Sequence, residues 1–268
     1  VNTISNNDTS GGIAKSMADT ITEFSDLWES NSYDLIFVLG DRYEMFAAAS
    51  STIPFNIPLA HLHGGETTLG AIDDKFRHAI TAMSTYHFTS SEEHKKRVID
   101  IIGTDKNVFN VGTLSLEFIN DLNITPKHTN NILFCYHPET VNLNNEESIN
   151  DVCDALDSID ATFTVLLPNN DTDHNVVRDI IQKRLVGSKY KISKALSYNE
   201  YYTELANCKC MLGNSSSGIY EAASFGKYAI NIGDRQKGRN TGGNVVHCSI
   251  SKDEIIKSYN KIDSLGEW

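Results

Sequence analysis

Apolar residues recur along the chain in two patterns, at the spacing of a helix face and in short uninterrupted runs. Near the N-terminus one helix face is predicted by five residues: Ile13, Met17, Ile21, Phe24 and Trp28. The segment 34–39 that follows is short and apolar between polar neighbours, which is typical of a buried parallel strand. The chain therefore begins with a helix that leads into a strand.

The same alternation continues through the rest of the sequence. In the first half we expect a helix from Tyr43, a strand at 57–62, a helix at 73–83, a strand at 86–89, a helix capped by Ser90 or Ser91, and a strand at 107–111. In the second half we expect strands at 132–136, 162–167, 190–193, 210–212 and 228–232, with helices at 146–156, 174–185, 198–206 and 217–224 between them.

Strict alternation of strands and helices predicts parallel sheets, because right-handed crossover connections place the helices on the faces of the sheet. The polar segment 114–130, which contains Pro126, interrupts this alternation and is interpreted as the crossing between domains. The sequence thus predicts an α/β protein with two Rossmann-like, doubly wound domains, residues 1–125 and 126–268, and a cleft between them.

Composition and charge exclude several classes of protein. The formal net charge of −12 argues against a broad nucleic-acid or anionic-membrane surface. No apolar run approaches the roughly 20 residues that span a bilayer. The five cysteines follow no disulfide or metal spacing, so we expect reduced thiols in a cytoplasmic protein.

Ligands of open α/β sheets lie outside the carboxyl ends of the strands, and polar clusters follow several predicted strands. Asp41 and Arg42 come directly after the strand ending at Leu39, where a helix cap paired with a surface arginine is the alternative interpretation. His61 and His63 alternate to the same side of the next strand and precede Glu66. Without a third ligand at zinc spacing, this cluster favours an acid/base site over a metal site.

The second half carries three further clusters. His137 follows the first strand there, and Pro138 holds it in an extended conformation, although a purely structural histidine is as consistent with the pattern. The turn 168–171 contains Asn170 and is also compatible with a plain turn. The segment 213–221 leads from strand to helix through small residues, which predicts an anion site at a helix N-terminus, and Arg239 follows the next strand with two other cations.

Together these segments resemble the hydrolysing UDP-N-acetylglucosamine 2-epimerases of bacterial sialic acid synthesis. The motifs that carry the resemblance are VLGDRYE, HLHGGETTLGAIDDKFRHAI, FNVGTLS, YHPET, PNNDT, GNSSSGIYE and INIGDRQKGR, in the order and at the spacing of that family. The resemblance implies two Rossmann-like domains in a GT-B-like arrangement, a UDP-sugar substrate and a homo-oligomer, dimeric or tetrameric.

The resemblance also implies residue roles. The UDP-sugar would be bound by Arg42, Asn170, Ser215, Ser216, Glu221 and Arg239, with Glu221 on the ribose and the serines on the diphosphate. Acid/base or leaving-group positions would fall on Asp41, Asp73 and His137. Many relatives carry a catalytic glutamate where this chain has His63, so either His63 transfers the proton or Glu66 supplies the carboxylate.

Two parts of the family pattern have no counterpart here, namely the first strand with its glycine-rich turn and the C-terminal helical segment. We therefore expect the sequence to be a fragment of a longer protein. The implied reaction is loss of UDP with removal of the C2 proton, followed by addition of water to give N-acetylmannosamine. It needs no metal and no redox cofactor.

Three alternatives remain open at this point. The same reaction can act on UDP-2,4-diacetamido-2,4,6-trideoxyglucose, as in legionaminic acid synthesis. A glycosyltransferase of the same architecture and a catalytically inactive UDP-sugar-binding module are the others. The many charged residues at the predicted site disfavour the inactive module, because UDP binding alone would not require Asp73 and His137.

Overall fold

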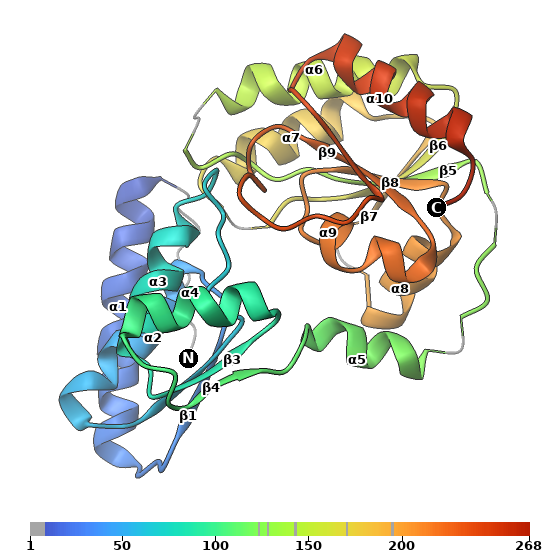
Figure 1. The fold of residues 1–268 in the computed structure, drawn as a ribbon. Coiled ribbons are helices and arrows are strands. Elements are labelled where there is room, and N and C mark those ends of the chain that lie inside the picture. The colour runs from blue at the N-terminus through green and yellow to red at the C-terminus, as the bar shows by residue number, and fades with distance from the viewer. Residues whose placement is uncertain (1–8, 123, 128, 142–143, 170, 194–195) are drawn as a thin grey trace. The chain divides into compact units, whose positions relative to one another are not determined.

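The computed structural model describes residues 9–268 of the chain apart from 123, 128, 142–143, 170 and 194–195. The chain forms two compact units that part between Leu114 and Ser115, and each is built around one parallel sheet (Figure 1). The predicted α/β class with two parallel sheets is confirmed. Within the described ranges, no helix is long and apolar enough to cross a membrane.

The first unit contains a four-stranded parallel sheet in the order β1-β2-β3-β4. Its elements are α1 (Ser10–Ser30), β1 (Ile36–Leu39), α2 (Tyr43–Ser51), a 3-10 turn (Ile53–Phe55), β2 (Leu59–Leu62), α3 (Asp73–Met83), β3 (Tyr86–Thr89), α4 (Glu92–Ile102) and β4 (Val108–Asn110). Each strand is added on the same side of the previous one, so right-handed crossovers place α2, α3 and α4 on one face. Helix α1 packs on α2 and completes that layer.

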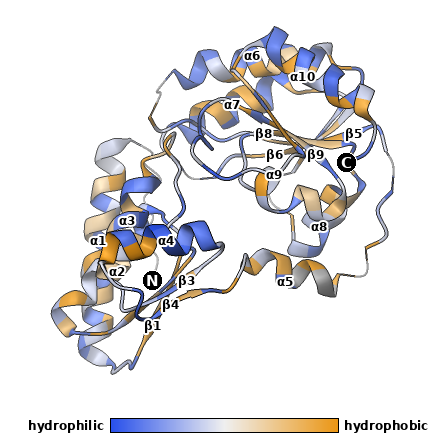
Figure 2. Cartoon of the chain, in the orientation of Figure 1, coloured by the Kyte–Doolittle hydropathy of each residue, from blue (hydrophilic) through white to orange (hydrophobic). Residues whose placement is uncertain are grey.

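The two faces of this sheet differ sharply. On the helical side, Val38 and Leu59 pack against Ala49 of α2 and Ile80 of α3. On the other side, the register aligns Leu39, Leu62, Phe88 and Phe109, and the rings of Phe37, Phe88 and Phe109 stack on one another. We call these three phenylalanines the aromatic row. Phe37 and Phe109 are 63% and 47% exposed, so the described residues leave these rings open to solvent. Figure 2 shows the hydrophobic colouring of β1, the strand that carries Phe37.

The second unit has a six-stranded parallel sheet in the order β10-β9-β8-β5-β6-β7. Its elements are α5 (Leu114–Asp121), β5 (Asn131–Cys135), α6 (Asn145–Ser158), β6 (Thr162–Leu166), α7 (His174–Arg184), β7 (Tyr190–Ser193), α8 (Tyr198–Asn207), β8 (Cys210–Gly213), α9 (Ser217–Tyr220), a 3-10 turn (Ala222–Phe225), β9 (Tyr228–Ile232), β10 (Val245–Cys248) and α10 (Lys252–Leu265). The chain runs outward from β5 to β7 and then returns to β8 on the other side of β5. The topological switch point therefore lies between β5 and β8.

This reversal covers both faces of the second sheet. The larger core joins Phe134 and Val165 of the sheet to α6, α7 and α10. The smaller core, on the opposite face, joins Leu133 and Met211 to Tyr202 of α8 and to the turn after α9. The sheet is buried on both sides, as is usual for parallel sheets.

Three local features differ from the sequence prediction. Helix α5 lies in the segment expected to be a polar crossing, and its Ile119 packs against the smaller core. The predicted helix 217–224 is instead one turn of α-helix and a 3-10 turn, since Ser217 and Gly218 are weak helix formers. Strand β10 was not expected, because it is a short, half-exposed strand at the sheet edge.

Each unit contains one of the two tryptophans of the chain. Trp28 of α1 is buried, and its indole N–H donates to the Ser51 hydroxyl of α2 at 2.9 Å. Trp268 is half exposed and lies edge-on to Tyr228 of β9. The indole of Trp268 also closes over the backbone at Gly243, where a Cβ would approach it to 2.8 Å.

Candidate functional site

The carboxyl edge of the first sheet gathers charged residues around one buried arginine. Arg77 of α3 is 1% exposed and forms ion pairs with Asp41, which follows β1, and with Asp74 at 3.1 Å. Its guanidinium also donates to the carbonyl of Glu66 at 3.2 Å. Asp74 further accepts the backbone N–H of Thr68 at 2.6 Å. The Arg77 cluster therefore fixes three separate segments at the end of the sheet.

His61 supports this cluster from inside the unit. The ring is fully buried, with Nε2 at 3.0 Å from the Gly40 carbonyl and Nδ1 at 3.2 Å from the Thr81 hydroxyl. Burial lowers the pKa of His61 to about 4, so the imidazole is neutral at pH 7. A neutral ring that donates to Gly40 and accepts from Thr81 satisfies both nitrogens, and it holds the turn that carries Asp41.

His63 is oriented by Glu66. Nδ1 of His63 lies 3.3 Å from the Glu66 carboxylate, and Nε2 accepts the backbone N–H of Leu114 at 3.4 Å. Ser90, which follows β3, donates to the same carboxylate at 3.2 Å. The expectation that His61 and His63 share one side of the strand is wrong, because His63 has a φ of 64° and has left the extended conformation. His63 and Glu66, which the sequence offers as alternatives for one catalytic position, thus form a pair.

The other predicted residues of the first unit lie nearby along the chain. Asp73 is half buried in the first turn of α3. Arg42 is half buried at the start of α2 and binds Glu44 at 2.7 Å. The alternative in which Asp41 caps α2 and pairs with Arg42 is wrong, since Asp41 pairs with Arg77 and α2 has no side-chain cap.

In the second unit, the switch point holds His137 in a network with Asn214. The backbone N–H of His137 donates to Oδ1 of Asn214 at 2.7 Å, and the Asn214 amide returns a hydrogen bond to the His137 carbonyl at 2.8 Å. Nδ1 of His137 accepts the backbone N–H of Asn169 at 3.1 Å. Gly213 allows the end of β8 to lie this close to the end of β5, because a Cβ at position 213 would clash with the Cys135 carbonyl.

Residues 215–221, which follow β8, lie at the same edge of the second sheet. Ser215 and Ser216 are half buried, and the backbone carbonyl of Ser216 accepts from Tyr220 at 3.0 Å as α9 begins. Because α9 is a single turn, its dipole is smaller than the predicted helix would provide. Backbone amides and hydroxyls remain as the groups that can meet an anion.

Two arginines reach the same region from the loop after β9. Arg239 donates to the Tyr220 hydroxyl at 2.6 Å and lies over its ring. Glu221, the next residue in the sequence, accepts from the Tyr201 hydroxyl at 3.5 Å. Arg235 pairs with the buried Asp171 at 3.0 Å and reaches the Asn214 carbonyl at 3.5 Å. Asn170, predicted to line the sugar side, lies outside the described residues.

Sequence reasoning did not assign roles to Arg77, Asp74 and Asn214. Arg77 lies three residues after Asp74 on a helix, a spacing that places the two side chains on one face, so that pair has a visible signal. No sequence pattern indicates the contact of Arg77 with Asp41, which is 36 residues away. None indicates the two hydrogen bonds between Asn214 and His137.

Chemically, the first unit offers carboxylates and a histidine held at fixed positions, which suits proton transfer. The second unit offers amides, hydroxyls and arginines, which suit a phosphate-bearing ligand. Within the described ranges, no group of three or more histidine, cysteine, aspartate or glutamate residues is placed to hold a metal ion.

Comparison with known proteins places these motifs in a family. A family model described as UDP-N-acetylglucosamine 2-epimerase matches residues 2–267. The chain is 36% identical to the GDP/UDP-N,N'-diacetylbacillosamine 2-epimerase (hydrolyzing) of Campylobacter jejuni, over 96% of this chain and 71% of that protein. It is 37% identical to polysialic acid biosynthesis protein P7 of Escherichia coli, over 92% of this chain and 67% of that protein.

A solved structure shares the fold. The crystal structure of UDP-GlcNAc 2-epimerase from Neisseria meningitidis bound to UDP-GlcNAc superposes with a TM-score of 0.78. The match covers 97% of this chain and 76% of that chain at 18% sequence identity.

Proposed function

Because the chain belongs to the UDP-N-acetylglucosamine 2-epimerase family, we propose that it acts as a hydrolysing 2-epimerase on a UDP-2-acetamido sugar. In this reaction the C2 proton is removed and the bond between C1 and the bridging oxygen breaks, so that UDP leaves and a C1–C2 double bond forms. Water then adds its oxygen to C1, and a proton returns to C2 from the opposite face. The observation that carries the proposal is the cluster of Asp41, Arg77 and the His63–Glu66 pair at one sheet edge.

For the nucleotide we propose the groups after β8 and β9. Ser215 and Ser216 would donate to the diphosphate, and Glu221 would accept from the ribose hydroxyls. Arg239 lies beside this segment through its bond to Tyr220, where its charge would stabilise the departing diphosphate. Arg42 would add a second cation from the first unit.

For the proton transfers we propose the first unit. The ion pair with Arg77 fixes the carboxylate of Asp41 at the sheet edge, where we propose that it acts as a base. The Glu66 carboxylate lies 3.3 Å from Nδ1 of His63 and orients the ring, so that the pair is held in place for proton transfer. Asp73 and His137 complete the proposed acid/base set.

The sugar itself has two candidates. N-acetylmannosamine would be the product from UDP-N-acetylglucosamine. The similarity to the Campylobacter jejuni enzyme favours the second candidate, UDP-N,N'-diacetylbacillosamine, whose product would carry a second acetamido group. Parallel assays of the two UDP-sugars, compared by kcat/KM, distinguish them.

Isotope labelling tests the reaction. Turnover in deuterium oxide should give a sugar with deuterium at C2, because the proton removed and the proton returned are separate. Water labelled with oxygen-18 should label C1 of the sugar and leave UDP unlabelled. A product that retained its original C2 hydrogen would overturn the proposal, as would unlabelled sugar.

A variant links this chemistry to the proposed residues. Asp73→Asn should preserve UDP binding and lower kcat by about 10²–10⁴, the usual contribution of a positioned acid or base. Asp100→Asn, on the exposed side of α4, is the matched control and should retain full kcat. Equal activity of the two variants would remove Asp73 from the acid/base set.

A further inference from the structure

The His63–Glu66 pair is extended by two further side chains, which come from the next strand and helix of the first unit. Ser90 follows β3, the neighbour of β2 in the sheet, and its hydroxyl donates to Oε1 of Glu66 at 3.2 Å. The Ser90 oxygen also lies 2.8 Å from Nδ1 of His94, in the first turn of α4. Ser90 thus connects His94 to the carboxylate oxygen that contacts His63. We call these four side chains the Glu66 network.

The donors and acceptors of the Glu66 network follow from its contacts. A carboxylate oxygen only accepts hydrogen bonds, so the single hydroxyl hydrogen of Ser90 is donated to Glu66. Nδ1 of His94 must then carry a hydrogen, which it donates to the Ser90 oxygen. Nε2 of His63 accepts the backbone N–H of Leu114, so the hydrogen of the neutral ring is on Nδ1, facing Glu66. Both imidazoles are therefore Nδ1–H tautomers in the neutral state.

Helix α4 fixes the backbone around this network. Ser91 caps the helix, and its hydroxyl accepts the backbone N–H of His94 at 3.2 Å. Gly65 lies directly against the first turn of α4, because a Cβ there would clash with the His94 carbonyl. The Gly65 carbonyl in turn accepts from Arg97 of the same helix. The loop that carries the histidine–glutamate pair is therefore held against α4.

Burial makes these contacts important for orientation. The side chains of Glu66 and His63 are 5% and 18% exposed, and His94 is buried. Water therefore competes little for the carboxylate, and a buried carboxylate that loses a donor is unfavourable. Without the Ser90 hydroxyl, we expect Glu66 to turn toward another donor, so that His63 loses its fixed partner.

We propose that Ser90 and His94 are positioning residues for the reaction proposed above. His94 holds the Ser90 hydroxyl, and Ser90 holds Glu66. Glu66 in turn holds the His63 ring in the orientation in which it transfers a proton. This role rests on the proposed function, because it concerns the same site. The sequence suggests Ser90 only as a possible cap of α4, and that role falls to Ser91.

The positioning can be measured without turnover. In protein labelled with ¹⁵N-histidine, long-range ¹H–¹⁵N spectra recorded above the ordinary imidazole pKa of about 6.5 distinguish the two neutral tautomers. His63 and His94 should both give the signals of the Nδ1–H tautomer. Ser90→Ala should average the His63 signals between the two tautomers, because Glu66 is no longer fixed. An Nε2–H tautomer of His94, or His63 signals unchanged in Ser90→Ala, would overturn the proposal.

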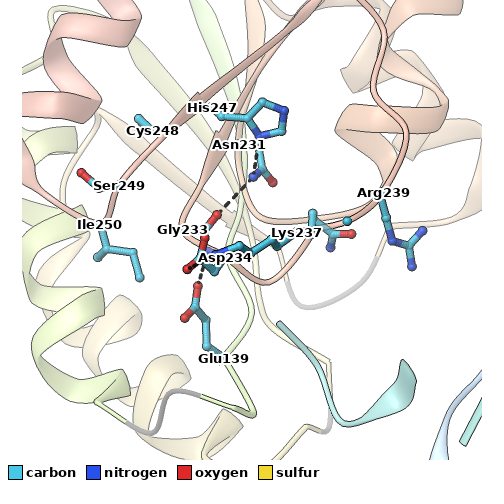
Figure 3. Close-up of a pocket in the computed structure, with 12 residues that line it drawn as sticks. Glu139, Asn231, Gly233, Asp234, Lys237, Arg239, His247, Cys248, Ser249 and Ile250 are labelled. Atoms are coloured by element: carbon cyan, nitrogen blue, oxygen red, sulfur yellow. Dashed lines mark hydrogen bonds and ion pairs between the residues drawn. The ribbon is translucent and has the colours of Figure 1, made fainter. Parts of the chain in front are cut away.

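Two substitutions in the second unit are matched controls. His247 and Ser249 are exposed at the carboxyl end of β10, beside a pocket of about 680 Å³ (Figure 3). Ser249→Ala removes the same hydroxyl group as Ser90→Ala. His247→Leu removes an imidazole, as His94→Leu does. Neither control should change the His63 signals, whereas His94→Leu should change them. Controls that changed these signals as much would contradict a local role of the Glu66 network.

Kinetics tests the same residues in the reaction. Ser90→Ala and His94→Leu should lower kcat by about 10- to 100-fold, since a misplacement of about 1 Å near the chemistry can cost about 10²-fold. The KM for the UDP-sugar should be unchanged, because neither residue is proposed to bind it. Ser90→Thr keeps the hydroxyl, and His94→Asn keeps an N–H near the position of Nδ1, so both should recover most of the loss. Conservative variants as slow as Ser90→Ala would contradict the proposed hydrogen bonds.

A double-mutant cycle separates positioning from a general structural effect. In the Glu66→Gln protein, which lacks the carboxylate, Ser90→Ala should lower kcat no further. An equal loss in both backgrounds would show that Ser90 acts independently of Glu66, and would overturn the proposal. A parent protein without activity on either UDP-sugar would instead refute the proposed function. The tautomer spectra would then still decide whether Ser90 and His94 position His63.

Discussion

The two sheets of this chain are both parallel, yet their surroundings differ. The second sheet is buried between two apolar cores, and its polar groups are concentrated at the carboxyl edge. The first sheet has one small apolar core on the helical side and the exposed aromatic row on the other. Its interior also holds His61 and Arg77, which are buried and polar.

This difference indicates that the units are stabilised in different ways. The second unit depends on apolar burial, which is independent of pH and insensitive to charge. The first unit depends in part on the hydrogen bonds of His61 and on the ion pairs of Arg77. Substitutions in its interior are therefore expected to affect stability and the candidate site together.

The largest expected effect is in the second unit. Phe134 lies on the central strand β5 and is fully buried, so Phe134→Ala should lower the free energy of unfolding by about 3–5 kcal/mol. Denaturant unfolding followed by circular dichroism measures this loss. A cost below about 1 kcal/mol would contradict the two-sided core.

The pH dependence should come from the first unit. The pKa of His61 is about 4 when folded and about 6.5 when unfolded, so between these values the unfolded chain binds a proton that the folded chain lacks. The free energy of unfolding should therefore be retained above pH 6.5 and fall as the pH drops toward 4, by about 3 kcal/mol.

The parent protein and a His61→Gln variant, unfolded in denaturant at several pH values, separate this effect from that of the carboxylates. In the variant, the free energy of unfolding should depend less steeply on pH between pH 6.5 and 4 than it does in the parent. His247→Gln, at an exposed position of the second unit, is the control and should keep the pH dependence of the parent. Identical slopes for the parent and His61→Gln would refute a buried neutral His61.

A smaller effect is expected at the switch point. Asn214→Ala leaves the buried backbone N–H and carbonyl of His137 without their partner, at a cost of about 1–3 kcal/mol. Asn214→Asp keeps the acceptor and loses the donor, so it should fall between the parent and Asn214→Ala in thermal stability. Equal melting temperatures for all three proteins would show that the network contributes nothing.

The smallest effect should be in the aromatic row. Phe109→Ala, the same change as at Phe134 and also on a parallel strand, removes a half-exposed ring and one stacking contact. It should cost less than about 1 kcal/mol. A loss as large as that at Phe134 would mean that another element covers this face.

Much of the fold was predictable from periodicity. The bounds of α3, β3, β7 and β9 are those predicted, because each combines an apolar pattern with clear polar limits. Helix α5 and strand β10 were missed because both are short and only partly buried. Their positions are decided by tertiary contacts that a local pattern does not record.

The candidate site was predictable only in part. The residues that follow strands were found because parallel strands end at one edge. The pairing of Asp41 with Arg77 could not be predicted, because it joins segments that are distant in the sequence. The contact of His63 with Glu66 could not be predicted either, because it depends on the positive φ of His63. Sequence thus indicated which residues lie at the edge, and the structure adds which of them touch.

The placement of the two tryptophans gives each unit its own optical probe. Trp28 is buried in the first unit with its indole N–H bonded to Ser51, so its fluorescence should be blue-shifted and shielded from iodide. Trp268 is half exposed in the second unit and open to the quencher. A Trp268→Phe protein would therefore report the unfolding of the first unit alone, without any added label.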